Sequence, residues 1–80
     1  MPIDEAIADL TTRIKGVSPN AVIRVKRRSD EEASMRVYAP ADHEGVLKEA
    51  TQEITLSLLR EGLDVQVLVY DIATSLPPEQ

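Results

Sequence analysis

Residues 22–28 alternate between charged and apolar side chains, and this period of two constrains the fold more than any other feature. Their sequence is Val-Ile-Arg-Val-Lys-Arg-Arg. Successive side chains of a β-strand point to opposite faces, so three cations share one face and a mostly apolar surface lies opposite. The three cations are Arg24, Lys26 and Arg28. The pattern predicts a strand with one basic face.

This basic strand belongs to an acidic chain, whose net charge is -5 over 80 residues. Positions 13–36 contain seven basic and three acidic residues, whereas the rest contains two basic and eleven acidic residues. Such an asymmetry indicates a polarised surface. The basic face is therefore interpreted as a surface for an anionic group of a partner.

Two segments have the periodicity of amphipathic helices. The first begins near Ile3 and ends near Gly16, and its apolar stripe has spacings of four, three and four residues. That stripe is Ile3, Ile7, Leu10 and Ile14. The second helix is predicted from Ala41 or Asp42 to about Glu61, and Gly62 followed by Leu63 is predicted to end it with a left-handed cap. Its buried stripe is Leu47, Ala50, Ile54 and Leu58, widened by Leu59 and Leu63. Leu56 falls outside this stripe and is expected to be exposed.

Two further segments have the pattern of strands. In the first, apolar residues at 35, 37 and 39 alternate with Arg36 and Tyr38, and Pro40 ends the pattern because proline cannot donate to a strand ladder. The polar residues 29–33 are expected to form a hairpin loop. In the second segment, residues 64–72, both faces are apolar. Val65, Val67 and Val69 share one face, and Leu68, Tyr70 and Ile72 share the other.

The predicted element order is α-β-β-α-β, which indicates an α+β fold with a three-stranded sheet and two helices packed on one face. The hairpin pairs the first two strands, and the third is expected beside either of them. Residues 1–74 are expected to form a single domain, followed by a flexible tail over residues 75–80.

The other face of the sheet is predicted to be left uncovered by the helices, and we call it the open face. Its candidate binding residues are Arg24, Lys26, Arg28, Arg36, Tyr38, Leu68 and Tyr70. Tyr and Arg are enriched at protein interfaces, and a core without Phe or Trp would gain from added burial. We therefore favour a binding or assembly domain that forms a homodimer, by packing sheet on sheet or by extending the sheet at its edge. A foreign protein partner is the second choice.

Nucleic-acid binding is the main alternative, because cations neutralise phosphates and tyrosine rings stack on bases. The α-β-β-α-β order resembles KH-like folds of the second type and the ribosome-associated factors built on them. This resemblance covers most of the chain and implies binding of RNA or single-stranded DNA. The GxxG loop of that family is missing, since neither Gly45 nor Gly62 has a second glycine at the required spacing.

Catalysis and cofactor binding are not expected. The chain has no Cys, its only histidine is His43, and its three glycines form no phosphate-binding loop. Asp42, His43 and Glu44 point in different directions on a helix and do not form a metal site, so His43 is expected to be solvated. No apolar run reaches the length of a membrane span, and the N-terminus carries acid where a signal peptide carries base. These features favour a cytoplasmic protein.

Overall fold

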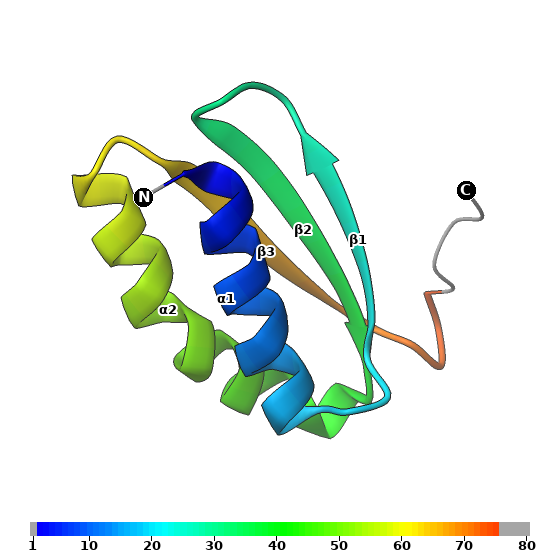
Figure 1. Ribbon diagram of the computed structural model, residues 1–80. Coiled ribbons are helices and arrows are strands. Elements are labelled where there is room, and N and C mark those ends of the chain that lie inside the picture. The colour runs from blue at the N-terminus through cyan, green and yellow to red at the C-terminus, as the bar shows by residue number, and fades with distance from the viewer. Residues whose placement is uncertain (1, 76–80) are drawn as a thin grey trace.

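The computed structural model describes residues 2–75, and these form two helices and a three-stranded sheet in the predicted order (Figure 1). The elements are α1 (Ile3–Val17), β1 (Val22–Arg27), β2 (Glu32–Ala39), the 3-10 turn η1 (Ala41–His43), α2 (Glu44–Arg60) and β3 (Asp64–Asp71). The α+β fold class is confirmed. Of the tail predicted over residues 75–80, all but Ser75 lies outside the described residues, and Ser75 donates its N–H to Asp71 O at 2.8 Å.

The strand order is β1-β2-β3, with β1 antiparallel to β2 and β2 parallel to β3. Both helices lie on the same side of this sheet (Figure 1). The structure therefore resolves the two placements left open for the third strand: β3 lies beside β2, which becomes the central strand. A parallel neighbour requires a long crossover connection, and α2 supplies it.

The core forms between the helices and the helix-facing side of β2. Four β2 side chains are buried there: Ala33, Met35, Val37 and Ala39. From α1 they meet Ile3, Ala6, Leu10 and Ile14, all of them buried. The predicted α1 stripe is confirmed at three positions, but Ile7 is only half-buried and packs at the edge of the core. Every buried apolar side chain of this core cluster is non-aromatic.

The buried side of α2 is narrower than predicted. Leu47, Thr51 and Leu58 are buried, whereas Ala50 and Ile54 are half-buried. Leu59 was expected in the stripe but is 58% exposed. With 3.6 residues per turn, Leu58 lies only about 20° around the helix from Leu47, and Leu59 lies about 120° away. Leu56 is exposed, as predicted.

The end of α2 follows the predicted left-handed cap. Gly62 has a φ of 85°, the only positive φ among the described residues. This conformation suits glycine because it has no Cβ. It allows the Leu63 N–H to donate to Leu58 O at 2.9 Å, and the Leu63 side chain returns to the core.

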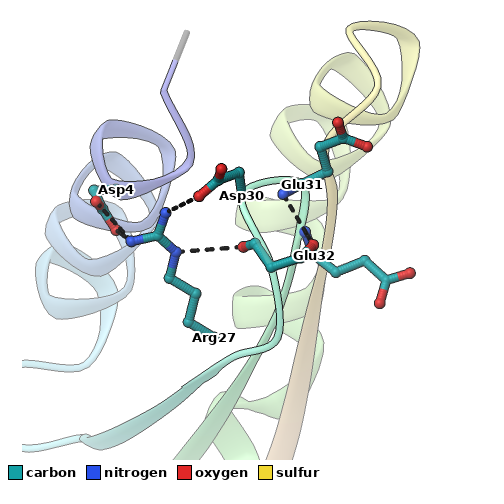
Figure 2. A network of polar contacts seen from close by, with 6 residues as sticks. Asp4, Arg27, Asp30, Glu31 and Glu32 are labelled. Carbon is teal, nitrogen blue, oxygen red and sulfur yellow. Dashed lines mark hydrogen bonds and ion pairs between the residues drawn. The ribbon is translucent and has the colours of Figure 1, made fainter.

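The hairpin loop is shorter than predicted, because β2 begins at Glu32. The Ser29 hydroxyl accepts hydrogen bonds from the backbone N–H groups of Glu31 and Glu32, both at 3.1 Å (Figure 2). The Arg28 N–H donates to Glu32 O at 2.9 Å and closes the turn. A serine that accepts from nearby backbone groups stabilises a tight turn, so only residues 28–31 separate the strands.

Candidate functional site

The strand register places six of the seven predicted binding residues on the open face. Across β1 and β2, Arg24 lies opposite Arg36. Across β2 and β3, Arg36 lies opposite Leu68 and Tyr38 lies opposite Tyr70. Directly opposed residues share a face, and the neighbours of these residues along β2 point to the core. Lys26 belongs to the same face, opposite Ser34.

Positive charge is concentrated at the centre of the open face. Arg36 is exposed and Arg24 is half-buried, with its Nη1 donating to Ile23 O at 3.5 Å. Lys26 on the same face is also exposed, so the Lys26 and Arg36 side chains are both accessible to an anionic group of a partner. Among residues 2–75, no carboxylate forms an ion pair with Lys26, Arg28 or Arg36.

The two tyrosines lie at the opposite end of the face from the hairpin and stack on each other. Their ring centroids are 5.3 Å apart, with an interplanar angle of 21°. Tyr38 is only 5% exposed, whereas Tyr70 is 36% exposed. The expectation of two accessible rings is therefore met by Tyr70 alone. Tyr38 supports the Tyr70 ring.

An apolar side chain lies beside the cations, directly opposite Arg36 in the register. Leu68 is 40% exposed on the outermost strand, next to Arg36 in the register. The open face thus combines guanidinium groups, one accessible phenol ring and one exposed aliphatic side chain.

Arg28 lies one residue beyond the end of β1, and its surroundings differ from those of the other cations. Its side chain lines a shallow polar hollow with Glu32, Ser34, Asp64 and Gln66. The two carboxylates of this hollow lower the positive potential at the hairpin end. Arg28 is therefore a weaker candidate than Arg24 and Arg36 for binding an anionic group.

A polar contact that was not predicted joins η1 to the end of α1. His43 Nδ1 lies 2.9 Å from the Ser18 hydroxyl. Ser18 is 1% exposed, so a substrate carbonyl cannot reach its oxygen, and the contact satisfies a buried hydroxyl. The prediction that His43 is solvated was wrong. His43 is half-buried, because η1 packs against the turn after α1. Sequence reasoning missed this pair because its residues are 25 positions apart.

Residues 2–75 contain neither a metal-binding cluster nor a membrane-spanning helix. No group of three His, Cys, Asp or Glu side chains in this range is placed to hold a metal ion. No helix in it has the length and apolarity needed to cross a membrane. The chain matches no protein-family model, no curated protein and no solved structure. The open face is the candidate functional site because it combines exposed cations with exposed Leu68 and Tyr70.

Proposed function

We propose that this protein is a non-catalytic binding domain whose open face binds an acidic, partly apolar surface of a protein partner. One observation carries the proposal: the exposed cations Lys26 and Arg36 share this face with exposed Leu68, which lies next to Arg36 in the register. Partner carboxylates would pair with these two cations. An apolar partner side chain would cover Leu68 and Tyr70.

A protein partner is favoured over a nucleic acid. Non-specific binding of single strands combines a basic groove with a series of aromatic rings on which successive bases stack. Of the two tyrosine rings on the open face, only that of Tyr70 is accessible, because Tyr38 is buried and stacks against it. Glu32 and Asp64 also place negative charge at the hairpin end. Exposed Leu68 suits the apolar centre of a protein interface better than a phosphate backbone.

An acidic partner is also favoured over a second copy packed sheet on sheet. A two-fold axis through the centre of the open face would bring Lys26 and Arg36 of one copy close to the same residues of the other. Four cationic groups would then be desolvated together, which costs free energy unless carboxylates pair with them. The acidic residues of this face lie at its hairpin end, away from that centre.

The test is a selection of phage-displayed peptides on the immobilised full chain, followed by measurement of Kd for synthetic copies of the selected peptides. We expect Asp- and Glu-rich peptides with one or two large apolar residues. The double variant Lys26→Glu, Arg36→Glu should weaken their binding at least about tenfold, as loss of charge-assisted contacts does at interfaces. The matched control is the double variant Arg13→Glu, Arg60→Glu. It changes the net charge of the protein by the same amount, but at exposed helix positions, and should leave Kd unchanged.

If both double variants weaken peptide binding equally, the loss of affinity comes from net charge alone, and the proposal is contradicted. A parallel titration uses fluorescent single-stranded RNA at two salt concentrations. Tight, steeply salt-dependent RNA binding that the open-face variant abolishes would replace the proposal with the nucleic-acid alternative.

A further inference from the structure

The outer edge of β3 has unpaired backbone groups. Asp64 N–H donates to Glu31 O at 2.7 Å and Ile72 N–H donates to Ala39 O at 3.0 Å, so even-numbered residues of β3 direct their backbone groups towards β2. The odd-numbered residues between them therefore direct their N–H and C=O groups outward. These are Val65, Val67, Val69 and Asp71, of which Asp71 uses its C=O to accept from the Ser75 N–H. Within residues 2–75 no strand pairs with this edge.

The two edges of the sheet differ in how they are protected. β1 carries three cations over its six residues, and charged side chains on an edge strand oppose pairing with another strand. β3 contains no Lys, Arg or Pro, and its acidic residues are only Asp64 and Asp71 at its two ends. A long apolar edge of this kind favours association with another strand.

The edge of β3 is also flanked by exposed apolar side chains of α2. Leu56 and Leu59 are both exposed, and together with Val65, Val67 and Leu68 they line a hollow beside the strand. Exposed apolar residues that gather in one place mark interaction surfaces. Here the exposed leucines of α2 lie next to the outward-directed backbone groups of β3.

We infer that β3 pairs antiparallel with β3 of a second copy across a two-fold axis, which forms a six-stranded sheet. The register centred on Val67 places Val67 opposite Val67 of the second copy and Val65 opposite Val69 of that copy. Both are pairs of outward-directed residues, so each exchanges two backbone hydrogen bonds. Asp64 then lies opposite Tyr70 of the second copy, and the acidic ends of the two strands do not meet.

The same symmetry brings the helix layers together. The two-fold axis is perpendicular to the sheet, so the α2 helices of both copies lie on the same side of the six-stranded sheet. The leucines at positions 56 and 59 of the two copies then face one another across the axis. Both open faces then lie on the other side and stay accessible. The dimer is thus independent of the proposed binding of an acidic partner, and a closed two-fold interface limits assembly to two copies.

The first experiment is analytical ultracentrifugation of the full chain from low micromolar to millimolar concentration. We expect a monomer–dimer equilibrium. Leu59→Glu should weaken dimerisation at least about tenfold, because it places two like charges against each other and removes apolar contact. Val46→Glu is the matched control, since Val46 is an exposed residue of α2 outside the hollow, and it should leave the equilibrium unchanged. The double variant Lys26→Glu, Arg36→Glu should also dimerise normally.

The second experiment is amide hydrogen exchange measured by NMR at low and high protein concentration. The amides of Val65, Val67 and Val69 should gain protection as the dimer forms, whereas those of Gln66, Leu68 and Tyr70 should be protected at both concentrations. A chain that stays monomeric, a dimer that leaves the three valine amides unprotected, or assemblies that grow beyond two copies would each overturn the inference.

Discussion

Arg27, the last residue of β1, binds the Asp4 carboxylate in the first turn of α1 through its Nη1, at 3.1 and 3.0 Å from the two carboxylate oxygens (Figure 2). Its Nη2 binds Asp30 of the hairpin loop at 2.8 Å. Arg27 faces the helix side of the sheet, at the end where α1 begins. The ion pair therefore joins the hairpin to the helix N-terminus, where an acidic residue also suits the helix dipole.

Removing this ion pair should have a small effect on stability. Both side chains are well exposed, and exposed ion pairs contribute roughly 0.2–1 kcal/mol. We expect a coupling free energy in that range from a double-mutant cycle of Asp4→Ala and Arg27→Ala, measured by urea denaturation. The coupling should fall when salt is added, because salt screens exposed charges. A coupling that does not respond to salt would contradict an electrostatic origin.

Truncating one leucine in the core and one on the surface should give very different results. Leu10 is fully buried in α1 against the sheet, whereas Leu59 is exposed on α2. Leu10→Ala should lower the free energy of unfolding by about 2–5 kcal/mol, which is a large part of the stability of a domain this small. Leu59→Ala should change it by less than about 0.5 kcal/mol, measured at concentrations where the protein is monomeric. Similar losses at both positions would contradict the packing described above.

Two glycine substitutions should have opposite signs. Gly62→Ala forces alanine into a backbone with φ of 85° and should destabilise the protein by about 1–2 kcal/mol. Gly45 lies in the first turn of α2, where an added Cβ meets nothing within 4 Å. Gly45→Ala should stabilise the protein by about 0.4–1 kcal/mol. The midpoints of thermal unfolding of the two variants should move in opposite directions from that of the wild type.

The contact between Ser18 and His43 should contribute measurably to stability. Ser18→Ala removes a buried hydroxyl that lies 2.9 Å from His43 Nδ1, and a typical hydrogen bond contributes about 1 kcal/mol. Ser57 is exposed on α2, so Ser57→Ala serves as the control and should change stability little. We expect denaturant midpoints to separate the two variants. A neutral Ser18→Ala substitution would show that the contact contributes nothing to folding.

Much of this fold was predictable from local patterns. The alternation around Arg24 and Arg36 correctly predicted that these residues share a face, because side-chain direction in a strand depends only on position along it. The Gly62–Leu63 pair also correctly predicted the end of α2, because a left-handed helix cap depends on the residues next to it in the chain. Leu59 was misassigned, since the predicted stripe was wider than the surface that α2 buries.

The accessibility of the candidate site was less predictable. Tyr38 and Tyr70 were correctly placed on one face, but the local pattern did not show that one ring is buried and the other accessible. Tyr38 is 5% exposed, whereas Tyr70, on the edge strand β3, is 36% exposed. The same placement creates the unpaired row of backbone groups on β3. An apolar strand such as residues 64–72 is compatible with either a central or an edge position.

The amino-acid sequence by itself determined the element order, the basic strand face and the glycine that ends the second helix, because each depends on neighbouring residues. Only the tertiary structure decided that β3 lies beside β2, that Arg27 reaches Asp4 and that Ser18 meets His43. Each of these contacts joins segments that are distant along the chain, and it forms only once the helices have packed against the sheet.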